Sequence, residues 1–187
     1  MKTHVLKSFS LVVLALTTTL FSACDLLDKA DDVSFDATVE ETILISEENE
    51  GTNVSYTETI TLDATSDPDI SKYKSKISGF TIKKISYQVV TFDGPAGATF
   101  SGTISFGDAS QATPTVAATV SNLNLQQANS SGQIFDLVIS QSDVDKIAAM
   151  LKDDKAVKLY LNGLLSSTPL YSSIRVILDV SVKADAL

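Results

Sequence analysis

After residue 32 the chain alternates between apolar and polar residues, which is the pattern of β-strands with one buried face. The first alternating segment places apolar residues at odd positions from Val33 to Ile45, and the last places them at even positions from Ile174 to Val182. Six shorter alternating segments lie between them, at residues 54–62, 80–89, 100–106, 116–120, 135–139 and 157–161. The pattern therefore predicts about eight strands.

Two stretches of turn-forming residues separate neighbouring segments. Residues 47–51 divide the first segment from the second, and residues 93–97 divide the third from the fourth. Gly, Pro, Asn and Asp favour turns, so we expect each of these pairs of segments to form antiparallel partners. Within the third segment the apolar positions change from even to odd at Lys83 and Lys84, which predicts a β-bulge at these two residues.

Helix signals occur at two places. Residues 66–69 combine a capping side chain with a proline, and they predict a short helix that ends near Gly79. Residues 142–145 predict the start of a second helix, which runs to about Lys152. Residues 122–132 are rich in Asn, Gln and Ser, and we expect a polar loop there.

Long alternating strands with one polar face favour antiparallel sheets. We therefore predict a mainly β fold, an antiparallel β-sandwich of about eight strands with two short helices, loosely immunoglobulin-like in architecture. A small β-barrel with a ligand cavity is the alternative. Residues 33–187 are enough for one domain with a substantial core.

The N-terminal segment has the layout of a secretory signal peptide. Lys2 and Lys7 precede an apolar run without acidic residues, which Thr17 to Thr19 interrupt. The run is short for a membrane-spanning helix, which needs about 20 mostly apolar residues. We therefore expect residues 1–23 to be removed.

The run ends in Leu20-Phe21-Ser22-Ala23-Cys24, and this pentapeptide resembles the lipobox of bacterial lipoproteins, with Phe21 where leucine is usual. The resemblance implies that Cys24 is acylated and becomes the first residue, followed by an acidic tether over residues 24–32. Two or more acyl chains give stable anchoring where one is marginal. An ordinary cleaved signal peptide that leaves a free thiol is the alternative.

The resemblance also bears on the membrane involved. In enteric lipoproteins an aspartate after the cysteine, here Asp25, retains the protein in the inner membrane. Residues 29–32 resemble the export tag of surface lipoproteins in other lineages, although a solvated tether explains them as well. We expect the outer membrane, with the domain in the periplasm or exposed at the surface.

Composition narrows the function. Without residues 1–23 the chain keeps 12 basic and 23 acidic residues, a net charge of −11, which disfavours nucleic acid as a partner. His4 is the only histidine and Cys24 the only cysteine. The mature domain would then lack the side chains of common catalytic triads and of zinc or haem sites. We expect no cofactor and a non-enzymatic binding or structural module, with an envelope protein or a glycan as partner.

The remaining candidate groups are carboxylates, tyrosines and lysines. Asp67 and Asp69 are weak calcium candidates, since helix capping is the more frequent role of such residues. Paired carboxylates leave a glycoside hydrolase as a further alternative, after a ligand carrier with an internal cavity. Four side chains are candidates for partner contact: Tyr73, Tyr160, Lys83 and Lys84. Both tyrosines are expected to be exposed, and the two lysines would suit an acidic partner.

Overall fold

The computed structural model describes residues 32–185, which form a mainly β, antiparallel fold, so the predicted fold class is confirmed. The strands are β1 (Asp32–Asp63), β2 (Ile77–Asp93), β3 (Thr99–Asp108), β4 (Val116–Asn124), β5 (Ile134–Asp136) and β6 (Ala156–Asp185). The helices are the short 3-10 helix η1 (Ala64–Ser66), α3 (Pro68–Lys72), α4 (Leu125–Ser131) and α5 (Gln141–Asp154). None of these helices is long and apolar enough to cross a membrane.

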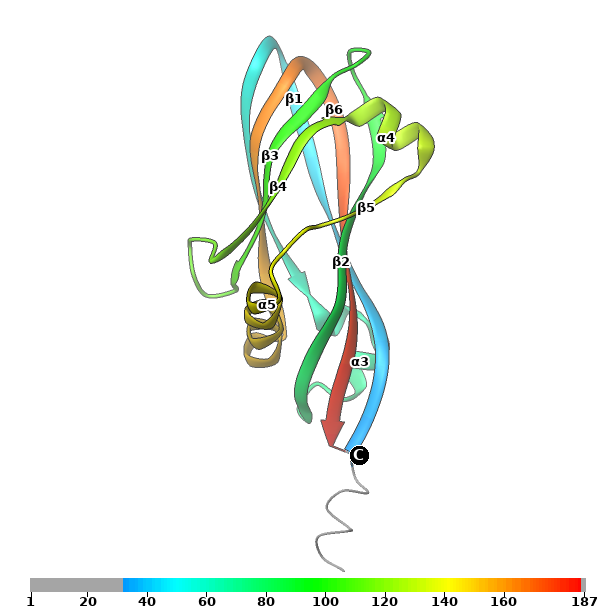
Figure 1. Ribbon diagram of the computed structural model, residues 1–187, viewed down its shortest axis with the longest axis vertical. Coiled ribbons are helices and arrows are strands. Elements are labelled where there is room, and N and C mark those ends of the chain that lie inside the picture. The colour runs from blue at the N-terminus through cyan, green and yellow to red at the C-terminus, as the bar shows by residue number, and fades with distance from the viewer. Residues whose placement is uncertain (1–31, 186–187) are drawn as a thin grey trace, which may run out of the picture.

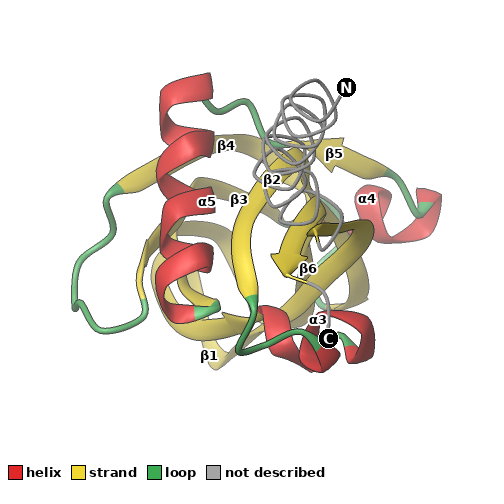
Figure 2. Ribbon diagram, turned by 90° about the horizontal axis from the view of Figure 1, so that it is seen from below, coloured by secondary structure: helices red, strands yellow, loops and turns green. Residues whose placement is uncertain are grey.

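The fold is organised around a long ribbon of β1 and β6. The two strands pair from Asp32 opposite Asp185 to Asp63 opposite Ala156. β2 and β5 extend the sheet beside the C-terminal half of β6, and β3 and β4 extend it beside the N-terminal half. Both long strands arch over at the top of the molecule (Figure 1), so the halves of the ribbon belong to two facing layers. From below, the strands curl around a common interior (Figure 2).

Both predicted strand pairs are wrong. Residues 33–45 and 54–62 are the two halves of β1, and each half pairs with β6 instead of with the other half. β2 and β3 likewise pair with different halves of β6. Alternation reports which face of a strand is buried and does not identify the partner strand. The turns at residues 47–51 and 93–97 thus connect one layer to the other.

We call the end of the molecule where these connections meet the arch end; it comprises residues 46–51, 93–97 and 165–171. The hydroxyl of Thr168 in β6 donates a 2.6 Å hydrogen bond to the carbonyl oxygen of Asn49, which joins the bends of the two long strands. We call the opposite end, where Asp32 lies beside Asp185, the base. The two ends are the top and the bottom of Figure 1.

Of the predictions about single elements, the β-bulge and the second helix are confirmed, the first helix is shorter than predicted, and the loop is wrong. The register of β2 against β6 shifts between Ile82 and Lys84, which confirms the predicted β-bulge. The first predicted helix is α3, but it ends at Lys72 and not near Gly79. The second is α5, which begins after its N-cap Ser140 and ends at Asp154, close to the predicted bounds. The prediction of a polar loop over residues 122–132 is wrong, because these residues contain the helix α4.

The core lies between the layers and is closed on one side by α5. Ile43 and Ile174 come from one layer, and Leu62 and Leu159 come from the other; all four are fully buried. α5 contacts β2 of the first layer and both β3 and β4 of the second. Its Ile147 and Leu151 are completely buried, so this one helix covers the core at the edges of both layers.

The outer edge of β1 is protected against strand pairing. Within residues 32–185 this strand pairs with β6 alone, which leaves its other edge open. The carboxylate of Glu41 accepts a hydrogen bond from the backbone N–H of Thr42, and Glu58 does the same for Thr59, each at 3.0 Å. Charged side chains on an edge strand hinder sheets from joining edge to edge. These two glutamates both charge the strand and occupy two of its backbone N–H donors.

Removing these acceptors is expected to promote self-association. In the double variant Glu41→Ala, Glu58→Ala the two edge amides are free to pair with the edge of another molecule. We expect a concentration-dependent shift from monomer to dimer and larger species in sedimentation velocity. The double variant Glu48→Ala, Glu50→Ala is the control, since it loses the same charge at exposed positions of the same strand. Equal association of both variants would attribute the effect to net charge alone.

Candidate functional site

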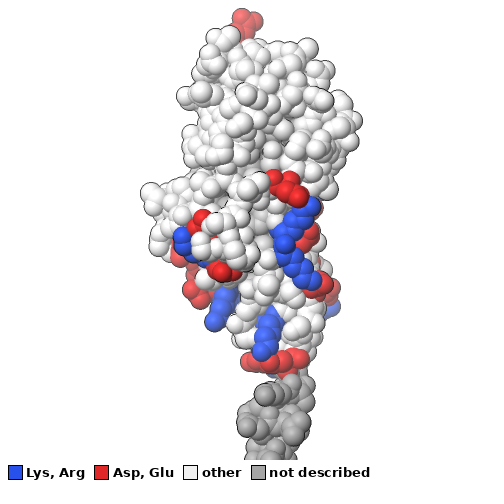
Figure 3. Space-filling view, viewed as in Figure 1, with Lys and Arg blue, Asp and Glu red and all other residues white. Residues whose placement is uncertain are grey.

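Charge is distributed unevenly between the two ends of the molecule. On the face drawn in Figure 3, side chains of both charges lie in the half near the base, while the upper half is almost free of charge apart from acidic atoms at its tip. The sequence explains this pattern: between Asp93 and Asp136 only Asp108 is charged, and residues 159–174 carry no charge. The two ends therefore offer different surfaces to partners.

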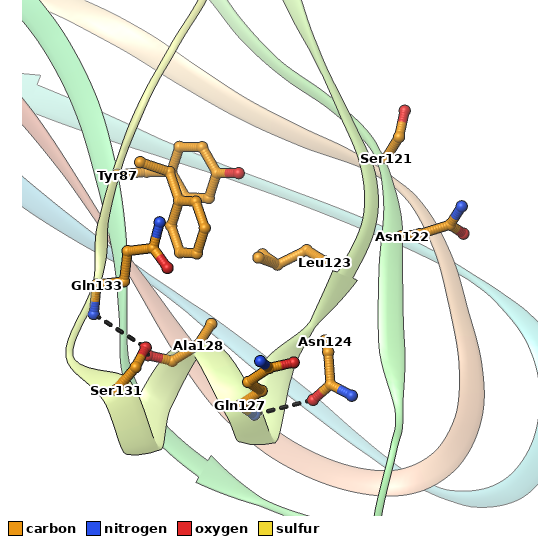
Figure 4. Close-up of a pocket in the computed structure, with 10 residues that line it drawn as sticks. Tyr87, Ser121, Asn122, Leu123, Asn124, Gln127, Ala128, Ser131 and Gln133 are labelled. Atoms are coloured by element: carbon orange, nitrogen blue, oxygen red, sulfur yellow. Dashed lines mark hydrogen bonds between the residues drawn. The ribbon is translucent and has the colours of Figure 1, made fainter.

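A pocket of about 300 Å³ lies in the uncharged half, between β2, β4, α4 and β5. Its apolar lining consists of Tyr87, Leu123, Ala128 and Phe135. Its polar lining consists of amides and hydroxyls alone, from Ser121, Asn122, Asn124, Gln127, Ser131 and Gln133. We call this hollow the amide pocket (Figure 4).

The aromatic part of the amide pocket follows from strand pairing. Tyr87 of β2 lies directly opposite Phe135 of β5. Cross-strand neighbours on one face are close enough for their side chains to touch. Their rings stack with centroids 5.2 Å apart and an angle of 18° between the planes. Burial raises the pKa of the Tyr87 phenol, so this hydroxyl stays neutral at physiological pH.

The polar part depends on α4, which the sequence analysis missed. Asn124 caps the helix, because its Oδ1 accepts a 2.8 Å hydrogen bond from the backbone N–H of Gln127. Gly132 ends the helix with a φ of 62°, a conformation that glycine adopts without strain. Leu125 and Ala128 form the buried face. The sequence did contain a signal for this helix: a capping asparagine, two apolar residues three positions apart and a glycine at the end.

Two glutamines of the amide pocket have unused side chains. The backbone N–H groups of Gln127 and Gln133 donate to Asn124 Oδ1 and to Ser131 Oγ. In the described part of the chain no hydrogen bond occupies their side-chain amides, and both residues are exposed. Figure 4 shows Leu123 directed toward Tyr87 across the pocket, with Gln133 below Tyr87 and Gln127 below Leu123. The amides are thus available to a ligand.

A second, wider pocket of about 610 Å³ lies at the arch end. It is lined by all three connections between the layers and includes Glu47, Glu48 and Asp93 beside the prolines 95 and 169. Tyr171 borders it and is 46% exposed. The backbone N–H and the side chain of Asn49 hold the pKa of Glu47 below its usual value. The arch end is therefore acidic.

Tyr160, one of the expected contact residues, is not exposed. Only 6% of it is accessible, and its hydroxyl donates a 3.2 Å hydrogen bond to the carbonyl oxygen of Gln111. The loop that follows β3 folds over this outer face of β6, so both faces of the strand are buried here. The prediction is wrong because alternation identifies one buried face and says nothing about a loop covering the other. Tyr73 is half-buried, and the centroid of its ring lies 5.4 Å from the centroid of the Phe35 ring.

Lys83 and Lys84 lie near the base and are paired within the molecule. Lys83 Nζ is 2.6 Å from Asp36 Oδ1, and Lys84 Nζ is 2.7 Å from Asp136 Oδ1. The hydrogen bond from Lys83 lowers the pKa of Asp36. Exposed ion pairs contribute little to stability, but these pairs neutralise the two lysines locally. A surface of mixed charge results, and it offers an acidic partner little net attraction.

The calcium candidates have local roles. Asp67 caps α3, since its Oδ1 accepts hydrogen bonds from the backbone N–H groups of Asp69 and Ile70, both at 2.9 Å. Asp69 pairs with Lys72 at 2.6 Å. Within residues 32–185 no group of three or more His, Cys, Asp or Glu side chains could hold a metal ion. Cys24 lies outside the described residues.

Comparison with known proteins leaves the family open. No protein-family model matches the chain, and no curated protein matches it. Among solved structures it is similar to a chain of turnip yellow mosaic virus, with a TM-score of 0.38 and 10% identity over 83% of this chain and 96% of that one. For the decameric BFDV capsid protein the TM-score is 0.37 at 8% identity, over 81% and 98%. Likenesses this weak support no argument about function.

Proposed function

We propose that the chain is a non-enzymatic binding module of the bacterial cell envelope, anchored to a membrane through acyl chains on Cys24. The observation that supports this function is the position of Asp32 at the base, opposite the arch end. A tether joined to Asp32 would hold the charged base toward the membrane. It would direct the arch end and the uncharged half, which contains the amide pocket, toward partners.

The proposed tether is long enough for such a role. Residues 24–32 reach at most about 30 Å when extended, at roughly 3.3–3.6 Å per residue. That length lets the base clear the lipid headgroups. The membrane that we propose is the outer membrane, with the domain either in the periplasm or exposed at the cell surface.

The described carboxylates favour binding over hydrolysis. A carboxylic acid that donates a proton in catalysis needs a raised pKa. The carboxyl groups whose pKa departs clearly from its usual value are Asp36, Glu47, Asp108 and Asp143, and in all four it is lowered. Hydrogen bonds to the charged form are the main cause in each. The amide pocket itself is lined by no carboxylate.

A filled core favours a binding module over a carrier with an internal cavity. Phe100, Ile104 and Phe106 of β3 are fully buried between the layers, opposite residues of β6. Large side chains that fill the interior leave no room there for a ligand. The amide pocket and the pocket at the arch end both open to the surface, where a partner reaches them directly.

Replacing Cys24 with serine tests the anchor. We expect the wild-type protein in the membrane fraction and the Cys24→Ser variant in the soluble fraction, because acylation requires the thiol. Labelling with radioactive palmitate should mark the wild type and not the variant. Ser22→Ala is the matched control, since it keeps a small residue beside the cysteine and should stay in the membrane. Membrane association of Cys24→Ser after an alkaline wash would refute the proposed anchoring.

A further inference from the structure

We infer that the amide pocket binds an uncharged sugar residue of a glycan, an inference that rests on the proposed binding function and names its ligand class. Three properties of the pocket support it. The lining is neutral, its free polar groups both donate and accept hydrogen bonds, and its apolar side chains form a continuous surface.

The neutral lining disfavours charged ligands. None of the ten residues around the pocket is Asp, Glu, Lys or Arg. Asp136 follows Phe135 in β5, but its carboxylate is engaged by Lys84 in a neighbouring hollow. A charged ligand would lose hydration on entry and gain no opposite charge in return, which is costly. An uncharged polar ligand avoids this cost.

The polar groups match the hydroxyls of a sugar. A sugar hydroxyl both donates and accepts hydrogen bonds, and a side-chain amide offers two donors and one acceptor oxygen. Gln127 and Gln133 keep all of these groups free, as described above. Asn124 uses its oxygen to cap α4, so its Nδ2 remains as a donor. The pocket thus offers more donors than acceptors, arranged around one small volume.

The apolar groups match the other part of a sugar ring. A pyranose presents C–H groups on its faces, and these groups pack on aromatic and aliphatic surfaces. Leu123, Ala128 and the stacked rings of Tyr87 and Phe135 supply such a surface. Phe135 is half-buried and Tyr87 is buried, so the phenylalanine is the more accessible ring. A volume of about 300 Å³ is at the small end of ligand pockets, which suits a single sugar unit.

One wall of the pocket is held in place by a third glutamine, Gln88. The side-chain Nε2 of Gln88 donates a hydrogen bond to the carbonyl oxygen of Gly132 at 2.9 Å. That bond fixes the end of α4 against β2 and so holds the wall of the pocket in place. Gln127 and Gln133 line the pocket, and within residues 32–185 their side-chain amides make no hydrogen bond, so a ligand can bind both.

Binding is best tested with the full-length protein in a detergent that has no sugar headgroup. The probes are neutral hexasaccharides of glucose, mannose, galactose, xylose and N-acetylglucosamine, with polygalacturonate as the charged comparison. Saturation-transfer NMR should detect at least one neutral probe, with the strongest transfer to the C–H protons of one sugar ring. No transfer to any neutral probe, or stronger binding of polygalacturonate, would overturn the inference.

Variants on one helix make the test specific. Gln127→Ala should weaken binding of the detected hexasaccharide at least tenfold in calorimetry, and Gln133→Ala should do the same. Gln126→Ala is the matched control, because Gln126 is exposed on α4 but does not line the pocket. Unchanged affinity in Gln127→Ala and Gln133→Ala would refute the assignment. Failure of sugar binding would leave the Cys24→Ser release intact, so the two proposals can fail separately.

Discussion

Replacing Gly102 with alanine is expected to destabilise the domain by about 3 kcal/mol, the upper range for overpacking a tight contact. Gly102 of β3 lies directly opposite Gly163 of β6. A Cβ atom at Gly102 would lie 2.1 Å from the carbonyl oxygen of Asn162 and 2.6 Å from the Cα of Gly163. Both are backbone atoms of the central strand, so the new methyl group can be accommodated only by separating β3 from β6. Urea denaturation measures the loss.

Gly79→Ala provides the control. This glycine also lies in a strand, β2, but no atom is within 4 Å of the position its Cβ would take. Alanine restricts the unfolded chain more than glycine does, so we expect stability to be unchanged or raised by up to about 1 kcal/mol. Equal destabilisation by Gly79→Ala and Gly102→Ala would show that the close approach at Gly102 is not the cause.

Replacing Leu151 with alanine should cost about 2–5 kcal/mol, the usual range for truncating a fully buried leucine. Leu151 lies on the last turns of α5 and, with Ile147, makes the fully buried contacts of this helix. Because α5 touches both layers, a cavity beneath it weakens the contact between them as well. Thermal and urea unfolding followed by circular dichroism measure the change.

Lys152→Ala is the corresponding control on the same turn of α5. Its side chain is exposed, and alanine is the best helix former, so stability should change by less than about 0.5 kcal/mol. Hydrogen exchange adds a second measurement: in Leu151→Ala the amides of α5 should exchange faster, while those in the centre of β6 should remain protected. Equal acceleration everywhere would mean that α5 and the sheet unfold together.

The positions of the strands were predictable because the burial of one face produces an alternation of apolar and polar residues within the strand itself. A strand with one buried face must alternate, and a bulge must shift the alternation, as it does at Lys83 and Lys84. The alternation within a strand does not indicate which other strand it pairs with. Residues 33–45 and 54–62 have the composition of a hairpin, yet both halves pair with β6, between 95 and 151 residues away along the chain.

The candidate site was less predictable. The amide pocket needs α4 beside β2, and this contact joins segments about forty residues apart. The helix itself was readable from Asn124 and Gly132, but the polar composition around them favoured a loop. Tyr160 shows the opposite difficulty, because a distant loop buried a side chain that the local pattern placed on the surface.

The central position of β6 has a consequence for the order in which the chain folds. Both layers depend on this strand, and it is synthesised after all the other described strands. Until it emerges, β1 lacks the one strand it pairs with in the described structure, and β2 has only the three-residue pairing with β5. Contacts between the two ends of a chain form slowly, since a long loop must close first. Neither layer can therefore be completed until β6 has been synthesised.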